Sequence, residues 1–192
     1  GRLTANIAHE IRNPLSAITH ASELLREERR GPLYERLLRI VLDNAQRLER
    51  IVRDVLELGR RDRSCREVLD LRELLPALIE EYLGKQQLPA DIIHLECSGL
   101  ATLCFDRSHL HQVLWNLLGN ALRHSRGLAG SVRVLVRDAP GESRVEVHVI
   151  DDGEGVDEAC REQIFEPFFT THHHGTGLGL YIARELCDAN GA

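Results

Sequence analysis

Apolar residues in the first sixty positions recur every three or four residues, which predicts two helices separated by a break at Gly31-Pro32. The apolar stripe of the first predicted helix is Ile7, Ile11, Leu15, Ile18 and Leu25. That of the second is Leu33, Leu37, Ile40, Asn44, Leu48, Ile51, Val55 and Leu58. Two helices joined by a short loop bury only part of their apolar surface, so we expect two hairpins to pair into a dimeric four-helix bundle. Periodicity alone also fits a coiled-coil spacer.

The pattern changes after a polar, arginine-rich stretch, which we interpret as part of a linker over residues 61–70. Further helices are predicted at 71–83, 107–124 and about 178–189. Short strands are predicted at 92–97 and 103–105, and a β-hairpin turning at 139–141 is predicted from alternating valines at 132–136 and 145–149. The expected fold is therefore α+β, with a helical domain at 1–60. An α/β sandwich follows at 71–192, its helices covering one face of a mixed sheet.

Composition narrows the function without defining it. Of 192 residues 43% are hydrophobic but only 4% aromatic, so aliphatic side chains are expected to fill the core. A formal net charge of -6 offers no basic footprint for nucleic acid. The five scattered cysteines form no CxxC pair, which favours reduced thiols in a cytosolic setting. No apolar run approaches the ~20 residues that cross a bilayer. The chain ends without a closing element, so we expect a fragment whose membrane attachment comes only from segments outside it.

His9 lies on the side of its helix opposite the apolar stripe, since ~100° per residue puts it about 180° away. Glu10 follows it, Asn13 lies one turn on, and Pro14 favours a kink. An exposed neutral imidazole offers a lone pair for attack on phosphorus, and a neighbouring carboxylate can take up the ring proton. A merely solvated histidine fits the pattern too. A zinc HExxH site does not, because the second histidine is missing.

A second group of polar residues forms a stripe on the amphipathic helix predicted at 107–124. Its members are Gln112, Asn116, Asn120 and Arg123. Asparagine has a low helix propensity, so the presence of two asparagines one turn apart within a helix calls for an explanation. Amide oxygens can ligate Mg²⁺, although a solvated helix face explains the same stripe.

Asp151 ends the alternation of 145–149 and, without a bulge, lies on the same face as the valines. A carboxylate at the end of an apolar row needs a hydrogen-bond donor, and an adenine amino group would supply one. The alternative is an aspartate that caps the turn at Asp152 and Gly153. Gly153 and Gly155 would let the backbone approach a flat ligand.

A glycine-rich run over 175–180 opens the last predicted helix. Backbone N–H groups at a helix N-terminus suit phosphates. The run is neither a Rossmann fingerprint, because no strand directly precedes it, nor a Walker A loop, which requires Gly-Lys-Ser/Thr. Three of the four phenylalanines lie just before it, at 164–169, where local core is the ordinary interpretation.

The order of these segments is more specific than any one of them. AHEIRNPLSAI, NLLGNALRHS, DDGEGV, FEPFFTT and GTGLGL resemble the H, N, G1, F and G2 boxes of bacterial sensor histidine kinases, across almost the whole chain. In sequence, these segments are most similar to those of the NtrB-like group of histidine kinases. The resemblance implies a dimerisation and phosphotransfer hairpin followed by a Bergerat-type ATP-binding domain, with ATP and Mg²⁺ as cofactors.

In that family His9 would be the phospho-acceptor, Glu10 its proton acceptor, and Asn13 a residue that positions water when the partner is dephosphorylated. Asn120 would ligate Mg²⁺ and Asp151 would accept the adenine amino group. The other implied nucleotide contacts are Asn116, Arg123, His124, Gly153, Gly155, Thr176, Gly177, Leu178 and Gly179, with a lid over residues 165–176.

The implied partners are a second copy of the chain and a response regulator, for this group an NtrC-type transcription activator. The implied location is the cytoplasmic portion of an inner-membrane sensor. Two departures stand out: His124 replaces a common aromatic, and histidines at 172–174 replace a common lysine or arginine of the lid. Two other functions stay open, an ATPase that uses nucleotide as a conformational clamp and a non-enzymatic coiled-coil module that senses nucleotide.

Overall fold

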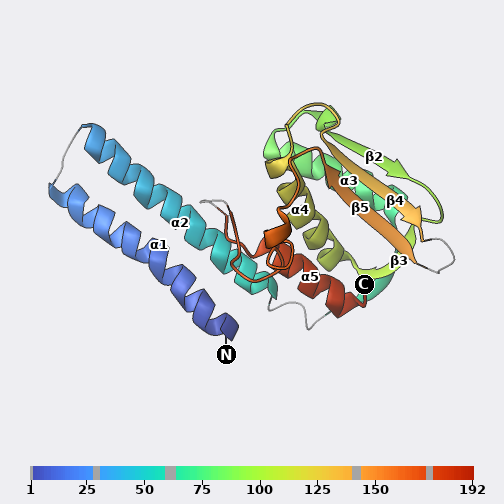
Figure 1. Ribbon diagram of the computed structural model, residues 1–192, viewed down its shortest axis with the longest axis horizontal. Coiled ribbons are helices and arrows are strands. Elements are labelled where there is room, and N and C mark those ends of the chain that lie inside the picture. The colour runs from blue at the N-terminus through green and yellow to red at the C-terminus, as the bar shows by residue number, and fades with distance from the viewer. Residues whose placement is uncertain (1, 28–30, 59–63, 140–143, 172–174) are drawn as a thin grey trace. The chain divides into compact units, whose positions relative to one another are not determined.

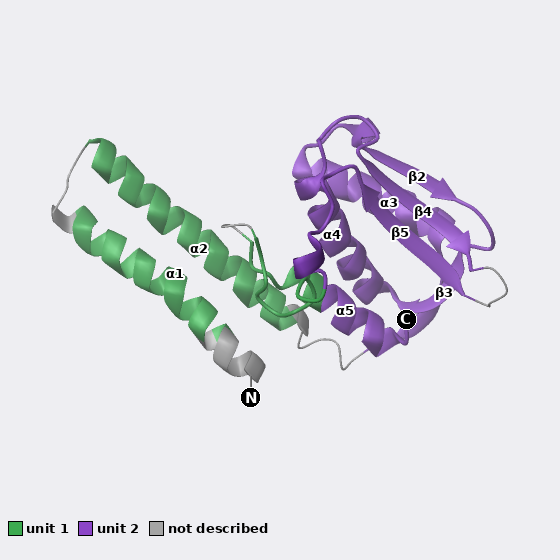
Figure 2. Cartoon of the chain, viewed as in Figure 1, with its two compact units in different colours: residues 1–59, 162–181 green, residues 60–161, 182–192 purple. Residues whose placement is uncertain are grey.

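The computed structural model describes residues 2–27, 31–58, 64–139, 144–171 and 175–192. The chain forms two compact units (Figure 2). The first comprises residues 1–59 and 162–181, and the second comprises residues 60–161 and 182–192. Residues 162–181 thus group with the helical part of the chain, although they lie within the ATP-binding domain expected at 71–192. Most of the turn predicted at 139–141, and the histidines at 172–174, lie outside the described residues.

Two long helices, α1 (Arg2–Glu27) and α2 (Pro32–Leu58), form an antiparallel hairpin (Figure 1). Gly31 precedes α2 with φ of +120°, a conformation that favours glycine. Pro32 then begins the helix, where its missing N–H costs no hydrogen bond. Among the described residues, no helix is long and apolar enough to span a membrane.

The buried side chains of the hairpin include Pro14, Ala21, Leu37 and Ile51. Leu15 of the predicted apolar stripe is 51% exposed in the single hairpin. Pro14 takes the buried position instead, since seven residues from Ile7 make almost two full helical turns. Leu33, in the first turn of α2, is likewise 50% exposed.

The second unit contains the predicted mixed sheet. Strand β4 (Val132–Asp138) pairs in parallel with β2 (Ile93–Cys97) and antiparallel with β5 (Val145–Asp151). Helices α3 (Leu71–Gln86) and α4 (Arg107–His124) cover one face of this sheet (Figure 1), as expected. Short 3₁₀ turns lie at Ala90–Ile92 and Glu158–Cys160, and the last helix is α5 (Gly179–Asn190).

A separate two-stranded sheet joins β1 (Arg66–Asp70) to β3 (Thr102–Asp106) in antiparallel pairing. β1 falls within the stretch 61–70 that we interpreted as a linker. Only Val68 and Leu69 are apolar in it, and of these Val68 is 76% exposed whereas Leu69 is buried. The strand therefore depends on its partner β3 rather than on a local apolar pattern.

Aliphatic side chains fill the core of the second unit, as the low aromatic content predicts. The inward residues of β4 are Val132, Val134 and Val136, each almost fully buried. They belong to one cluster with buried residues of both covering helices, among them Leu75 and Leu118. This packing fixes where the ends of α4 and β5 lie.

The first turn of α4 is capped by the buried side chain of Asp106. Burial would raise the pKa of this carboxyl, but hydrogen bonds from the Ser108 hydroxyl and from the N–H groups of Cys65 and His109 lower it to about 2. Asn190 of α5 accepts a hydrogen bond from the Asp106 N–H at 2.9 Å and bonds the His109 ring at 3.0 Å. These contacts fix the start of α4 to the end of α5.

Candidate functional site

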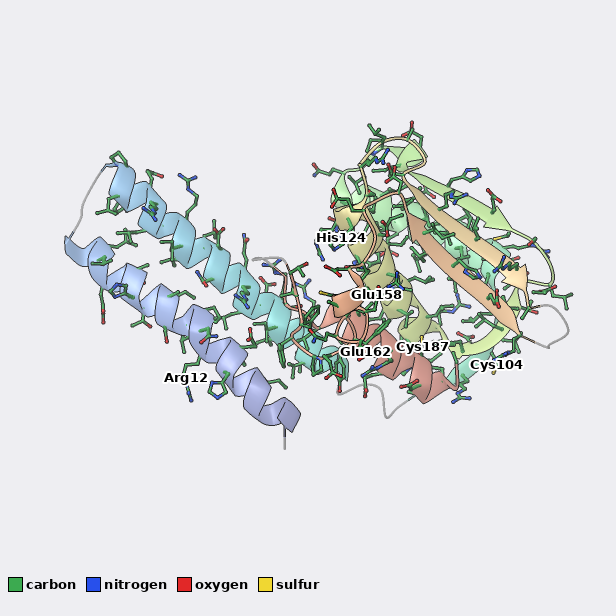
Figure 3. The ribbon with its side chains drawn as sticks, in the orientation of Figure 1. Arg12, Cys104, His124, Glu158, Glu162 and Cys187 are labelled. Carbon is green, nitrogen blue, oxygen red and sulfur yellow. The ribbon has the colours of Figure 1, made fainter. Side chains whose placement is uncertain are left out.

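The polar stripe of α4 lies beside the core of the second unit. Val113, Leu114, Leu118 and Ala121 are buried, as predicted for the opposing face of this helix. Asn116 and Asn120 are half-buried, whereas Arg123 and His124 are exposed. Figure 3 shows His124 at the C-terminal end of α4.

The amide of Asn116 is only partly satisfied. It accepts a long hydrogen bond from the Gln112 amide at 3.4 Å. Its own nitrogen is buried and has no hydrogen-bond partner among the described residues. A buried polar atom left unpaired costs about 1–3 kcal/mol. A ligand with acceptor oxygens, such as a phosphate, would satisfy it, and an oxygen of the neighbouring Asn120 amide is a donor atom that suits Mg²⁺.

Asp151 lies where strand parity places it. The pairing of β4 with β5 runs without a bulge from Val145 to Asp151, so Asp151 stands opposite the buried Val132 and on the same face as the valines. Its Oδ1 accepts the N–H of Gly153 at 3.0 Å, which is the turn cap considered as the alternative. Its Oδ2 accepts no hydrogen bond from a described residue. The two interpretations are therefore compatible, because one oxygen caps the turn and the other is left for an external donor.

Two glycines shape the turn after β5. A Cβ on Gly153 would clash with the carbonyl oxygen of His124, so only glycine lets this turn lie against the end of α4. Gly155 has φ of +80°, and a Cβ there would meet no atom within 4 Å. The backbone of the turn is thus close-packed at Gly153 and open at Gly155.

Asp152 holds the same turn from its other side, and sequence reasoning did not identify this role. Its carboxylate accepts the N–H of Arg126 at 2.9 Å and the hydroxyl of Ser131 at 3.0 Å. These hydrogen bonds, chiefly the one from the Arg126 N–H, lower the pKa of Asp152. Asp152 therefore connects the end of β5 to the loop that follows α4. An aspartate directly before a turn glycine was the signal available in the sequence.

In the hairpin, His9 is exposed, as its helical phase predicts, and Asn13 is exposed one turn further on. Glu10 behaves differently, because its side chain is only 25% exposed and forms an ion pair with Arg47 of α2 at 2.9 Å. Sequence reasoning missed Arg47, since the second helix was considered only for its apolar stripe.

The glycine-rich segment belongs to the same unit as the hairpin, whereas Asp151 belongs to the other. The Thr176 hydroxyl donates to Oδ2 of Asp54 in α2 at 2.8 Å. The Gly177 carbonyl accepts the N–H of Phe168 at 2.9 Å, and with φ of +68° a Cβ on Gly177 would clash with the Phe168 backbone. Leu178 is fully buried, and Gly179 begins α5. Glycine at 177 thus lets this segment lie against the phenylalanine-rich one.

No three His, Cys, Asp or Glu side chains of the described residues come together as a metal-binding group. Amide oxygens such as those of Asn116 and Asn120 are of the kind that Mg²⁺ accepts beside waters and substrate phosphates.

Comparison with known proteins gives matches across most of the chain. Residues 1–64 match the family model "His Kinase A (phospho-acceptor) domain", and residues 105–192 match "Histidine kinase-, DNA gyrase B-, and HSP90-like ATPase". The sensor protein kinase PilS of Pseudomonas aeruginosa is 44% identical over 100% of this chain and 37% of its own length. The chain spans about a third of the length of the curated relatives it matches.

Solved structures agree in fold. The catalytic domain of the histidine kinase ThkA is 32% identical, with a TM-score of 0.54 over 66% of this chain and 83% of that one. ThkA in complex with the response regulator protein TrrA gives a TM-score of 0.72 at 29% identity, over 96% of this chain and 53% of that one.

Proposed function

The chain belongs to the histidine kinase family, and from this we propose that it transfers the γ-phosphoryl group of ATP to its own His9 and then to an aspartate of a response regulator. A ring nitrogen of His9 forms the new bond to phosphorus, the bond from phosphorus to the bridging oxygen breaks, and ADP leaves. The proton of the ring passes to Glu10. The single observation that best supports this is the exposed His9 with a half-buried, ion-paired carboxylate next to it.

We assign nucleotide binding to the second unit and the glycine-rich segment. Asp151 keeps one carboxylate oxygen for the adenine amino group, and Gly155 leaves open space next to it. The unpaired amide of Asn116 faces phosphate oxygen, and Asn120 is the proposed protein ligand of Mg²⁺. When bound, Mg²⁺ would neutralise charge on the phosphates. The other proposed nucleotide contacts are Arg123, His124, Gly153, Thr176, Gly177, Leu178 and Gly179, and the proposed lid covers 165–176.

The proposed domain division is a dimerisation and phosphotransfer domain at 1–60, a linker at 61–70 and an ATP-binding domain at 71–192. Apolar side chains exposed on the hairpin support pairing with a second copy. Likeness to PilS supports an NtrC-type transcription activator of type IV pili as the partner, and attachment to the inner membrane through segments outside this chain. The complex of ThkA with the response regulator protein TrrA supports a response regulator as a partner of this chain. Asn13 is proposed to position water for dephosphorylation of that regulator.

The decisive experiment is incubation of the full-length protein with γ-labelled ATP and Mg²⁺, followed by comparison of the label in acid and in alkali. A phosphohistidine loses its label in acid and keeps it in alkali. His9→Gln should abolish labelling, whereas His20→Gln, which changes another exposed histidine of α1, should not. Label that survives acid, or persists in His9→Gln, contradicts the proposal. Nucleotide binding without label would instead favour a conformational-clamp ATPase.

A further inference from the structure

Arg47 of α2 contacts the residue that follows the proposed phospho-acceptor. Its Nη2 lies 2.9 Å from Oε2 of Glu10. The two side chains are only 27% and 25% exposed, respectively, so the pair is largely shielded from water. By comparison, another ion pair on α2, between Arg53 and Glu49, has both side chains more than 60% exposed, at 66% and 71%.

The position of Arg47 is unfavourable for a residue that only stabilises the hairpin. Its Nε is buried and has no hydrogen-bond partner among the described residues. Shielded ion pairs give little net stability, because desolvation offsets the attraction between the charges. Apolar side chains in place of both Arg47 and Glu10 would pack between the helices without leaving a polar group unpaired. The guanidinium therefore points to a role in holding Glu10.

One N–H of the Arg47 guanidinium donates to the carboxylate of Glu10 at 2.9 Å, and a charge-assisted hydrogen bond of this kind fixes the position of the oxygen that accepts it. In Glu10 the oxygen Oε2 is occupied by Arg47, and Oε1 accepts no hydrogen bond from a described residue. We propose that Arg47 is a positioning residue for phosphorylation of His9, which orients Glu10 so that Oε1 takes the proton leaving the imidazole. This inference rests on the proposed function.

In the phosphorylation step, Glu10 accepts the proton that His9 loses. As the nitrogen–phosphorus bond forms and ADP departs, the ring N–H proton moves to Oε1 of Glu10. Arg47 keeps all its protons throughout and touches neither ATP nor His9. Loss of Arg47 should therefore lower the turnover number, and it should do so only when Glu10 is present. General acid–base groups contribute about 10²–10⁴-fold to rates, and loss of orientation alone should remove part of that.

The test compares Arg47→Met, Arg47→Lys and Glu10→Gln, alone and combined, in the full-length protein. Arg47→Met should lower kcat for His9 phosphorylation about tenfold, with KM for ATP unchanged. Arg47→Lys, which keeps the positive charge and a hydrogen-bond donor for Oε2 of Glu10, should recover most of the rate. In the Glu10→Gln background Arg47→Met should cause no further loss. Arg53→Gln is the matched control, since it removes an exposed ion pair from the same helix and should leave kcat unchanged.

Several outcomes would overturn the inference. Phosphorylation of His9 at the wild-type rate in Arg47→Met would be one of them. A loss in Arg47→Met that multiplies with the loss in Glu10→Gln would be another, because it would show that Arg47 acts independently of Glu10. A rate loss that follows a lower unfolding temperature in both Arg47 variants would show a purely structural role. If the wild-type protein acquires no acid-labile phosphate at all, the proposed function itself fails, and that result is distinguishable from all the others.

Discussion

In the helical hairpin the residues proposed to carry phosphate lie on an exposed surface, whereas in the α/β unit those proposed to bind nucleotide lie at the edge of a closed core. His9 owes its position to helical phase alone. Asp151 owes its position to a strand register and to a turn held by Gly153 and Asp152. A phospho-acceptor must be reached by other domains, so exposure on a regular helix suffices. A nucleotide pocket needs segments far apart in the sequence to meet.

The same contrast holds for the exposed apolar side chains. On α2, Leu38, Leu42, Val52 and Leu56 are each at least 40% exposed and lie within about 40° of one line along the helix. In the α/β unit the exposed leucines Leu100 and Leu128 are isolated in loops. Several exposed apolar side chains along one helix face indicate a missing packing partner, whereas single exposed leucines are ordinary.

The largest predicted effect follows from this stripe. Leu42, which is 57% exposed, would be buried in a dimeric bundle, and Leu42→Asp would place an uncompensated charge there. We expect the dimer dissociation constant to rise about a thousandfold, equivalent to about 4 kcal/mol. Sedimentation equilibrium measures it. Leu128→Asp, at a site 65% exposed in the α/β unit, is the control and should leave the dimer intact. Equal effects of the two substitutions would contradict the contrast.

The next largest effect is expected where the backbone at Gly153 lies against the end of α4 in the α/β unit. Gly153→Ala would drive a Cβ into the His124 carbonyl and should lower the free energy of unfolding of this unit by about 3 kcal/mol. Gly155→Ala meets no atom, so it should cost only about 1 kcal/mol, for its positive φ. Gly84→Ala in the last turn of α3, also without a clash, should be neutral or slightly stabilising. Urea unfolding measures all three, and equal losses would contradict the proposed packing.

The sequence predicts features that depend on neighbouring residues and misses those that depend on distant ones. Helical phase correctly placed His9 on the exposed side, and strand parity correctly placed Asp151, because both depend on short local repeats. Pro14 was considered only as a residue that favours a kink, although it is fully buried and lies close to the centre of the stripe. Strand β1 and the contact of Arg47 with Glu10 could not be predicted, since each depends on a partner more than thirty residues away.

Substitutions of the adjacent residues Asp151 and Asp152 should affect nucleotide binding and the stability of the turn differently. Asp151→Asn removes the anionic acceptor proposed for adenine and should weaken nucleotide binding about fiftyfold, since hydrogen bonds to charged groups contribute about 1.5–3 kcal/mol. Calorimetric titration with a non-hydrolysable ATP analogue measures this. Asp152→Asn, whose contacts are to Arg126 and Ser131, should loosen the turn and change affinity less. Unchanged binding in Asp151→Asn would show that its only role is the cap on Gly153.

The smallest predicted effect is the loss of stability of the α/β unit in acid. The pKa of Asp106 is about 2 in the folded unit against an ordinary value of 3.8. Because the folded pKa is depressed, the ionised carboxylate stabilises the fold above pH ~4, and this stability is lost as pH falls through about 2. The contribution should be about 2 kcal/mol. Asp106→Asn should therefore lower stability at neutral pH and flatten the acid dependence, as followed by unfolding monitored at Trp115, which lies in α4. An unaltered slope between pH 5 and 2 would show that the hydrogen bonds to Asp106 do not depend on its charge.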